Sequence, residues 1–368
     1  MNRVFTVVVA LLVLTSTFGI GAVGAHDGVA AAQSEIECEF PATVTDATGE
    51  EITVEEEPER IVAMQPSDAQ MLWEIGAREK VVGMPVGQYT EYLEGHDEPT
   101  DITQDDGLTV NTEQVVDLEP DVVFASSVAD EEQVAQLRDA GITVYQVGDA
   151  TSIDDVRENT ETFGQLSGEC AGAAETLDWM DEEIGAIERA VEGEDSPTVL
   201  FAMGDGFTAG EGTFIEDVIE TAGGENLGSE AGIESYGQIS EEVVLSEDPD
   251  WIVYPDGNFE EPPVSDQVLQ STTAGQEDQV FAVNANQMNQ PGPQVVYAID
   301  ALAETFHPDA YEAIGNDTAA ANDSTNEAAG NDSTDAADGS GGEDQPGFGV
   351  VAALVALAAA GLLFFRRR

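Results

Sequence analysis

The sequence predicts an α/β protein with two lobes, each built on a central, mostly parallel sheet, that are joined by one long α-helix. The helix is indicated over 171–192, where apolar residues recur at spacings of three and four and form one stripe. At about 1.5 Å per residue, a helix of this length reaches roughly 33 Å, which is enough to connect two small domains. The stripe residues are Leu177, Met180, Ile184, Ile187 and Val191.

A short pattern occurs once on each side of this helix. Its first copy runs from Thr112 to Phe124 and its second from Glu241 to Val253. In both copies a glutamate stands seven residues ahead of a Pro-Asp pair, with apolar residues two and three positions after the glutamate. Each copy is typical of a short helix, a turn and a buried strand. One unit used twice on opposite sides of a long helix predicts two similar lobes.

The first lobe shows the order of elements that produces a parallel sheet. A hairpin is expected within 42–54, because its apolar residues alternate around a Thr-Gly turn. The apolar strand 60–64 is followed by a helix that starts at Pro66 and by a strand at 81–83. Strand, helix and strand in succession indicate parallel pairing, which a strand at 142–147 continues.

The second lobe is expected to follow the same plan. A strand at 198–203 leads through a glycine-rich turn into a helix around 214–219, which ends at Gly223. The second copy of the repeated pattern comes next, followed by a strand at 280–283 and a final helix over 294–306.

Acidic residues dominate the chain, with 75 Asp and Glu against 10 Lys and Arg and a formal net charge of -65. This composition excludes nucleic-acid binding, because phosphates are held by clusters of Lys and Arg. The chain is nonetheless 42% hydrophobic and its apolar runs are regular, which favours a folded protein over a disordered one. Salt at about 1 M shortens the Debye length to roughly 3 Å and screens the repulsion. We therefore infer a folded protein that lives in concentrated salt.

The sequence predicts an export signal over 1–32, and it has a low-complexity stretch over 315–345. Arg3 and the apolar run 4–13 precede small residues, as in a secretory signal peptide, which we favour over an uncleaved anchor. The stretch 315–345 has no periodicity and predicts a disordered stalk. Three triplets in it are candidate glycosylation acceptors, the alternative being coincidence in an Asn-rich tract. Their asparagines are Asn316, Asn322 and Asn331.

The C-terminal segment predicts attachment to a membrane. Its apolar run, 349–365, is just long enough to cross a bilayer, and the three arginines after it favour a cytoplasmic end. Its Pro-Gly-Phe start resembles the sorting signal of archaeal surface proteins, which implies cleavage and transfer to a lipid anchor as the alternative fate. Both fates place the folded part on the outer face of the cell membrane. The expected segments are a signal peptide (1–32), a first lobe (33–170), an inter-lobe helix (171–193), a second lobe (194–314), a stalk (315–345) and the anchor or sorting signal (346–368).

The chain has two cysteines, Cys38 and Cys170. In an exported protein a disulfide between them is allowed, and we favour it over two unpaired thiols. It would close a loop of more than a hundred residues and contribute about 4 kcal/mol in the chain-entropy model.

The sequence gives little support to an enzyme. It has three histidines and no Gly-x-Ser-x-Gly elbow. The glycine-rich segment 204–210 differs from a dinucleotide loop, because its third glycine comes one place late, so a turn lining a ligand cleft is favoured. Tyr89, Tyr92 and His96 could together hold a ferric ion or a haem, or could simply belong to an exposed aromatic loop.

Two segments, 60–83 and 113–124, resemble the helical-strut class of solute-binding proteins of ATP-driven importers, and the similarity extends over about 40–313. This class has the fold of the class III periplasmic binding proteins. Three further segments are similar to its cobalamin-binding branch, namely 149–153, 207–210 and 223–226. The resemblance implies a monomeric binding protein, without a cofactor of its own, that delivers a solute to a permease and its ATP-binding subunit.

The resemblance also implies roles for individual residues. Tyr89, Phe207 and Tyr236 fall on positions that contact a corrinoid in an aromatic cleft, the usual place for a ligand. Glu113 and Glu242 fall on the positions that dock onto arginines of the permease. The alternative for both glutamates is a helix-start carboxylate favoured by the helix dipole.

Three functional alternatives remain open. Asp105 and Asp106 stand where the branch has a tryptophan, and 286–289 replaces an acidic-aromatic segment, so a ferric siderophore or haem is the alternative ligand. Anionic siderophore chelates need arginines, and the second lobe has no basic residue, which favours cobalamin or a related corrinoid. A surface adhesion protein would also fit the stalk and the anchor, but the repeated unit argues against it.

Overall fold

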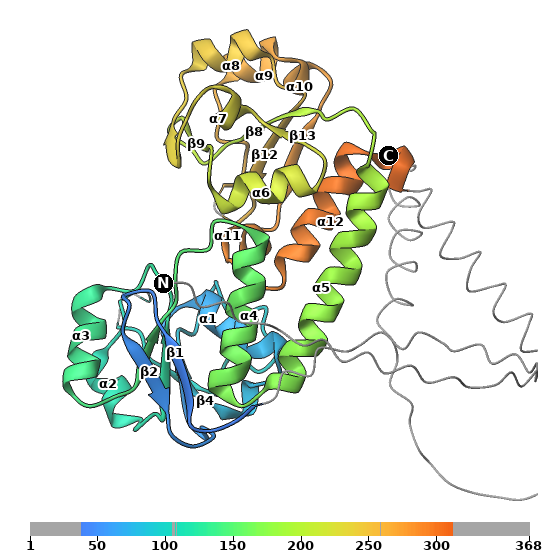
Figure 1. Ribbon diagram of the computed structural model, residues 1–368. Coiled ribbons are helices and arrows are strands. Elements are labelled where there is room, and N and C mark those ends of the chain that lie inside the picture. Colours follow the sequence, from blue (N-terminus) through green and yellow to red (C-terminus); the bar gives the residue numbers. More distant parts are fainter. Residues whose placement is uncertain (1–37, 105–106, 108, 258, 312–368) are drawn as a thin grey trace, which may run out of the picture. The chain divides into compact units, whose positions relative to one another are not determined.

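The computed structural model describes residues 38–104, 107, 109–257 and 259–311, and in these ranges it has two lobes joined by a long helix (Figure 1). The expected signal peptide, stalk, glycosylation triplets and C-terminal tail lie outside the described residues, as do Asp105 and Asp106. No helix in the described part of the chain is long and apolar enough to cross a membrane.

The first lobe has a five-stranded parallel sheet in the order β5-β4-β3-β6-β7. From β3 the chain passes to β4 on one side, and from β6 it passes to β7 on the other side, so the strand order reverses between β3 and β6. An antiparallel hairpin of β1 and β2 precedes this sheet. The strands are β1 (Ala42–Thr45), β2 (Glu51–Val54), β3 (Ile61–Ala63), β4 (Val81–Met84), β5 (Thr100–Asp101), β6 (Val122–Ala125) and β7 (Val144–Gln146). The helices are α1 (Pro66–Glu74), α2 (Thr112–Asp117), α3 (Glu131–Asp139) and α4 (Ile153–Ser167), with a 3₁₀ turn at Arg78–Lys80.

The second lobe repeats this plan with a parallel sheet in the order β10-β8-β12-β13. Its strand order reverses between β8 and β12, and a separate antiparallel pair is formed by β9 and β11. The strands are β8 (Thr198–Phe201), β9 (Phe207–Ala209), β10 (Glu225–Asn226), β11 (Tyr236–Gln238), β12 (Trp251–Pro255) and β13 (Val280–Val283). The helices are α6 (Phe214–Thr221), α7 (Leu227–Glu230), α8 (Glu241–Glu247), α9 (Asp266–Ser271), α10 (Thr273–Gln276), α11 (Ala285–Asn289) and α12 (Val295–Phe306). The predicted fold class, two α/β lobes with mostly parallel sheets, is confirmed.

The long helix is α5 (Cys170–Val191), and it buries three of the five predicted stripe residues, while Leu177 and Val191 are partly exposed. Met180, Ile184 and Ile187 are each at most 3% exposed. One apolar cluster extends from the first lobe along α5 into the second lobe, and α12 of the second lobe packs against α5 (Figure 1). The two lobes therefore share part of their core through this helix.

Both copies of the repeated pattern fold as a short helix, a turn and a buried strand, namely α2 with β6 and α8 with β12. The residue before each proline is left-handed, with φ of 45° at Glu119 and 51° at Asp248. The aspartate after each proline then bonds to the start of the neighbouring strand through its backbone and its carboxylate.

We call these two aspartates, Asp121 and Asp250, the strand clamps. Asp121 N–H donates to the Arg60 carbonyl at 2.8 Å, and its carboxylate accepts the N–H groups of Glu59 and Arg60 at 2.9 Å each. Asp250 N–H donates to the Thr198 carbonyl, and its carboxylate accepts the Thr198 N–H, both at 2.9 Å. The repeat thus encodes the same strand-to-strand connection in each lobe.

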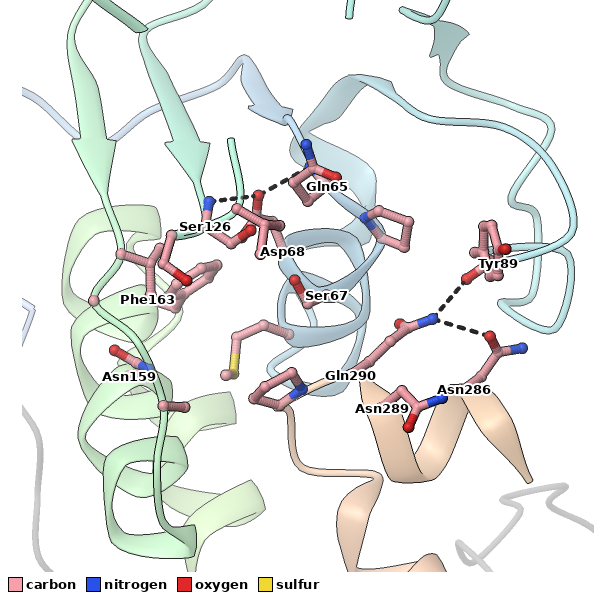
Figure 2. Close-up of a pocket in the computed structure, with 18 of the residues that line it drawn as sticks. Gln65, Ser67, Asp68, Tyr89, Ser126, Asn159, Phe163, Asn286, Asn289 and Gln290 are labelled. Carbon is pink, nitrogen blue, oxygen red and sulfur yellow. Dashed lines mark hydrogen bonds between the residues drawn. The ribbon is translucent and has the colours of Figure 1, made fainter. Parts of the chain in front are cut away.

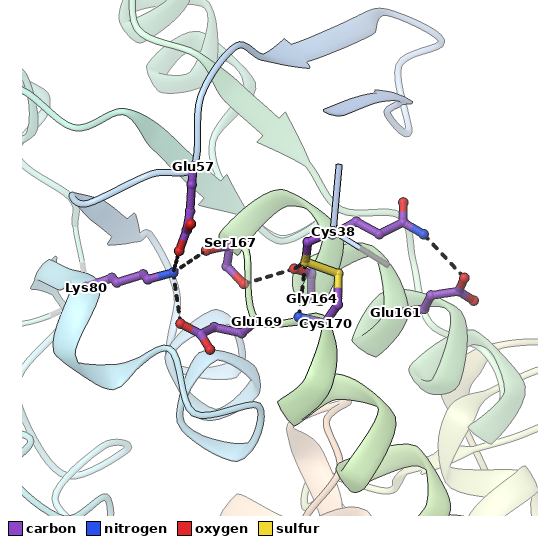
Figure 3. The surroundings of a disulfide bond; sticks show 9 residues. Cys38, Glu57, Lys80, Glu161, Gly164, Ser167, Glu169 and Cys170 are labelled. Atoms are coloured by element: carbon purple, nitrogen blue, oxygen red, sulfur yellow. Dashed lines mark hydrogen bonds and ion pairs between the residues drawn. A yellow bond between two sulfur atoms is a disulfide. The ribbon is translucent and has the colours of Figure 1, made fainter. Parts of the chain in front are cut away.

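A disulfide joins Cys38, ahead of β1, to Cys170 at the start of α5, with a Cα–Cα distance of 5.7 Å (Figure 3). Beside it Lys80 Nζ lies 2.9 Å from Glu57 and 2.8 Å from Glu169. The covalent bond and these ion pairs attach the first lobe to the base of the long helix.

Candidate ligand-binding site

A cavity of about 360 Å³ lies at the carboxyl edge of the first-lobe sheet, beside the reversal point between β3 and β6. Its walls come from the segments that follow β3, β6 and β7, from α4 and from α11 with the residues after it (Figure 2). In open parallel sheets, ligands bind in the crevice at such a reversal of strand order. The cavity is therefore the expected place for a ligand between the lobes.

One polar side chain, that of Asp68, connects the ends of β3 and β6 at the cavity wall. Asp68 is 2% exposed, and its Oδ2 accepts the N–H of Gln65 at 3.0 Å and the N–H of Ser126 at 3.1 Å. Burial raises the pKa of Asp68 to about 7, although these hydrogen bonds act in the opposite direction. The hydroxyl of Ser126 is buried and has no hydrogen-bond partner among the described residues.

An amide network fixes the second-lobe segment around α11 to the first lobe. The Tyr92 hydroxyl donates to Gln290 Oε1 at 3.0 Å, and Gln70 Nε2 donates to the Tyr92 hydroxyl oxygen at 2.9 Å. Gln290 Nε2 donates to the Tyr89 carbonyl at 3.1 Å and to Asn286 Oδ1 at 3.0 Å. Gln70 and Gln290 are at most 8% exposed, and bonded amides at such depth hold one geometry. One wall of the cavity is thus supplied by the other lobe.

The three predicted aromatic contacts occupy two different surfaces. Tyr89 is 37% exposed and lines the cavity. Phe207 and Tyr236 are 44% and 50% exposed and do not line it. They lie on β9 and β11, where the register pairs Phe207 with Gln238 and Tyr236 with Ala209. Residues in these two pairs share one face of the strands, so Phe207 and Tyr236 form an exposed aromatic surface on the second lobe.

The second-lobe aromatic surface lies close to the first lobe. The pKa of Tyr236 is raised, chiefly because its hydroxyl is shielded from water and also because of the nearby charge of Asp149, which follows β7. A direct bond between the lobes runs from the N–H of Ile153 to Asp217 Oδ2 at 2.7 Å. The carboxyl edges of the two sheets therefore bound one inter-lobe space.

Positive charge is absent from the described lining of the cavity. Arg138 pairs with Asp46 and Glu50 at the β1–β2 hairpin. The other described ion pairs lie at the first-lobe surface and along α4 and α5. They join Arg78 to Glu94 and Glu98, Lys80 to Glu57 and Glu169, and Arg157 to Asp154 and Asp181.

Two of the three candidate iron ligands have other partners. The Tyr92 hydroxyl bonds Gln70 and Gln290, and the His96 ring lies 3.2 Å from the Leu93 carbonyl. Within the described residues no group of His, Cys, Asp and Glu could hold a metal ion. The Tyr92 hydroxyl is thus already engaged with protein amides.

The glycine-rich segment after β8 is a turn of the second-lobe edge. Gly204 and Gly206 have φ of 86° and 75°, and the Phe207 N–H closes the turn on the Gly204 carbonyl. The turn leads into β9 and not directly into a helix, unlike a dinucleotide loop. A Cβ at Gly204 would lie 2.9 Å from the Phe259 ring, so the glycine allows this ring to pack on the turn.

Glu113 and Glu242 occupy the same place in the two copies of the repeat. Each is the second residue of its helix, α2 or α8, and each is exposed. Neither makes an ion pair with a described residue. Both carboxylates are thus available at the surface, one on each lobe.

Several site residues were not predicted as such. Pro66–Asp68 was read only as a helix start, and 286–289 only as a departure from the family pattern. Phe259 and Ser126 were not considered. Ser126 follows β6 and Phe259 follows β12, the strands of the two repeat copies. Ligands bind at the carboxyl ends of parallel strands, so this position is the signal that could have indicated both residues.

Comparisons with known proteins agree with this architecture. The profile of the periplasmic binding protein family matches residues 61–286, and the PGF-CTERM motif matches residues 345–368. A cobalamin-binding protein of Halobacterium salinarum is 41% identical over 98% of both chains. A vitamin B12-binding protein of Salmonella typhimurium is 26% identical over 53% of this chain and 71% of that protein.

Solved structures show the same fold. The periplasmic haem-binding protein RhuT of Roseiflexus sp. RS-1 has a TM-score of 0.60 at 25% identity, over 68% of this chain and 99% of that one. The periplasmic vitamin B12-binding protein BtuF of Vibrio cholerae has a TM-score of 0.58 at 21% identity, over 68% of this chain and 97% of that one.

Proposed function

The chain belongs to the periplasmic binding protein family, and on this basis we propose that it captures cobalamin or a related corrinoid outside the cell and delivers it to an ATP-driven permease. The solute would bind between the two lobes, in contact with Tyr89 on one side and with Phe207 and Tyr236 on the other. The 41% identity to a cobalamin-binding protein over 98% of both chains supports this ligand class. The role is that of a binding protein and not of an enzyme.

The observation that carries the choice of ligand is the absence of Lys and Arg from the described cavity lining. Haem and ferric siderophores carry carboxylates or other anionic groups, which proteins hold with Arg or Lys. Here such an anion would meet the buried carboxyl of Asp68 instead. A corrinoid presents uncharged carboxamides and a large apolar face, which aromatic contacts and amide hydrogen bonds can hold. The cavity chemistry therefore favours the corrinoid.

A ferric siderophore or haem is the second candidate. It is favoured by the similarity to a haem-binding protein of known structure and by the phenol of Tyr89 at the cavity, since tyrosine can ligate haem iron. The lack of a cation at the cavity is the argument against it.

Calorimetric titration in concentrated salt distinguishes the two ligand classes. Cyanocobalamin should bind the purified protein with a dissociation constant in the micromolar range or tighter. Haemin and a ferric tris-catecholate, both anionic and titrated in the same buffer, should bind at least about tenfold more weakly, because the cavity offers them no counter-charge. If cyanocobalamin shows no binding at tens of micromolar while an iron ligand binds, the corrinoid proposal is wrong.

We further propose that Glu113 and Glu242 dock onto two arginines of the permease. Replacing both by Ala should leave cyanocobalamin affinity unchanged and reduce uptake by cells at least about tenfold. Each single replacement should have a smaller effect, because concentrated salt screens exposed ion pairs. Glu241→Ala, which removes the neighbouring exposed carboxylate of α8, is the matched control. Normal uptake by the double variant would exclude the docking role.

Attachment to the cell surface follows from the C-terminal motif at residues 345–368. We propose that the folded part faces the outside, where it meets the solute. Glycosylation at Asn316, Asn322 and Asn331 belongs to the same proposal, and mass spectrometry of the native protein would test it.

A further inference from the structure

The hydroxyl of Ser126 is a polar group that the fold leaves unsatisfied. It is buried at the wall of the cavity and has no hydrogen-bond partner among the described residues. Buried hydroxyls in proteins nearly always have a partner, and one without a partner destabilises the fold. A group that hydrogen-bonds there on ligand binding would remove this cost.

Asp68 is the second group at this wall. Its Oδ2 already accepts two backbone N–H groups, from Gln65 and from Ser126 itself (Figure 2). A carboxylate offers about four acceptor positions, and no Lys or Arg in the described lining of the cavity neutralises it. The Ser126 N–H bond of 3.1 Å joins the residue that carries the hydroxyl to the Asp68 carboxyl, and both residues line the same cavity.

The amide of Gln290, on the facing wall, already has partners. Gln290 Nε2 bonds Tyr89 and Asn286, and Gln290 Oε1 accepts from Tyr92. These contacts hold α11 in place. Among the polar side chains that line the cavity, Asp68 and Ser126 combine a buried carboxyl with a buried, unsatisfied hydroxyl on residues joined by a hydrogen bond. The pair also lies at the end of β3 and β6, where the strand order reverses and ligands bind.

We propose that Asp68 and Ser126 form a subsite for a primary carboxamide of the ligand. The amide N–H donates to the Asp68 carboxylate, and the amide carbonyl accepts from the Ser126 hydroxyl. This inference rests on the proposed function, since the rim of a corrinoid carries such carboxamides. A ligand carboxylate at the same place would be repelled by Asp68.

The protonation of Asp68 near neutral pH supports a carboxamide over an ammonium group. With a pKa of about 7, the carboxyl is present in both forms at neutral pH. A carboxamide can donate to the ionised form and accept from the protonated form, whereas an ammonium group can only donate.

The first experiment compares cyanocobalamin with its singly hydrolysed derivatives, in which one peripheral propionamide is a carboxylate. At about pH 9, where Asp68 is ionised, one of these acids should bind the wild type at least about thirtyfold more weakly than cyanocobalamin. In Asp68→Asn, the dissociation constant of this acid should exceed that of cyanocobalamin only about fivefold or less, because the repelling charge is removed. We call this quotient of dissociation constants the discrimination ratio. Asp130→Asn, which changes another helix-start carboxylate of the first lobe away from the cavity, should leave the discrimination ratio unchanged. An unchanged discrimination ratio in Asp68→Asn would overturn the subsite.

The second variant tests the hydroxyl. Ser126→Ala should weaken cyanocobalamin binding about five- to tenfold, because the amide carbonyl loses its donor. Its thermal midpoint should not fall, since no protein partner of the hydroxyl is lost. Wild-type affinity in Ser126→Ala would contradict the proposal.

A third measurement does not depend on corrinoid binding. Propionamide, titrated into the isotope-labelled full chain, should shift the backbone amide signals of Ser126 and Gln65, and the shifts should disappear in Ser126→Ala. Propionate and propylammonium should leave these signals in place. A shift with propylammonium but not with propionamide would replace the carboxamide subsite by an ammonium site. If the wild type does not bind cyanocobalamin, the proposed function fails, and this titration still decides the subsite.

Discussion

The two lobes share a topology but present different chemistry at their ligand edges. In both lobes the strand order reverses beside the strand of the repeated pattern, which is β6 in the first lobe and β12 in the second. A strand clamp, Asp121 or Asp250, fixes that strand to its neighbour. The first-lobe edge carries buried polar groups, Asp68 and Ser126, whereas the second-lobe edge carries the aromatic rings of Phe207, Tyr236 and Phe259. In the proposed function, the duplicated backbone would determine where the solute lies, and the side chains at each edge would determine which part of it they contact.

The lobes also differ in charge and covalent attachment. The disulfide and all but one of the described basic residues belong to the first lobe or the start of the long helix, and the exception is Arg189 near the end of α5. The second lobe has only acidic charges. In concentrated salt this imbalance is screened, so a whole lobe can fold without any cation.

The largest expected effect tests the aromatic edge. Replacing Phe207 and Tyr236 together by Ala should weaken cyanocobalamin binding about a hundredfold or more, because two large apolar contacts are lost. Calorimetry in concentrated salt measures this change. Tyr297→Ala, which removes a ring that is 38% exposed on α12, is the matched control and should bind as the wild type does. A loss of less than tenfold would mean that the polar edge provides most of the affinity.

The next effect concerns the dependence of stability on pH. The pKa of Asp68 is about 7 in the folded protein, against 3.8 for an ordinary Asp, so the folded state holds a proton that the unfolded state releases. This contribution is fully present below about pH 4 and is lost as the pH rises through 7. Between pH 5 and 8 it should lower the free energy of unfolding by about 2–3 kcal/mol.

Asp68→Asn should remove this decline, which urea denaturation at several pH values and constant salt would detect. In the second lobe, Asp300 on α12 has its pKa raised to about 6, first by burial and then by the charges of Glu304 and Glu183. Asp300→Asn should therefore flatten the profile less, and mainly below pH 6. If Asp300→Asn had the larger effect, the polar edge of the first lobe would not be the main pH-sensitive element.

The smallest effect compares the strand clamps. The Asp121 carboxylate accepts two backbone N–H groups and that of Asp250 accepts one. Asp121→Ala should cost about 2 kcal/mol and Asp250→Ala about 1 kcal/mol, at roughly 1 kcal/mol for each hydrogen bond. Urea midpoints at one salt concentration measure the difference. Equal costs would show that burial of the adjacent proline, and not the carboxylate, fixes the turn.

Features encoded locally were predictable from the sequence. The stripe of α5 and the two repeat copies depend on spacings within one element, and the succession of strand, helix and strand predicts the parallel sheets. Tyr89 could be placed at the cavity through the family resemblance. The roles of Phe207, Tyr236, Glu113 and Glu242 are consistent with their exposed positions and stay predictions.

The polar edge could not be predicted, because its contacts join distant parts of the chain. Asp68 meets Ser126 across 58 residues and Gln290 meets Tyr89 across 201. Each of these residues has an ordinary local explanation, such as the cap of α1 for Asp68. Only the folded arrangement shows that one side chain both caps a helix and faces a cavity.

The attachment of α11 to the first lobe has a consequence for engineering new solute specificities by recombination. A chimera that exchanged everything after α5 between two family members would separate Gln290 from Gln70, Tyr89 and Tyr92. The transferable module is better taken as 194–284, with the donor sequence ending before α11. Residues 285–311 are then inherited together with the first lobe, although they follow the second lobe in the chain.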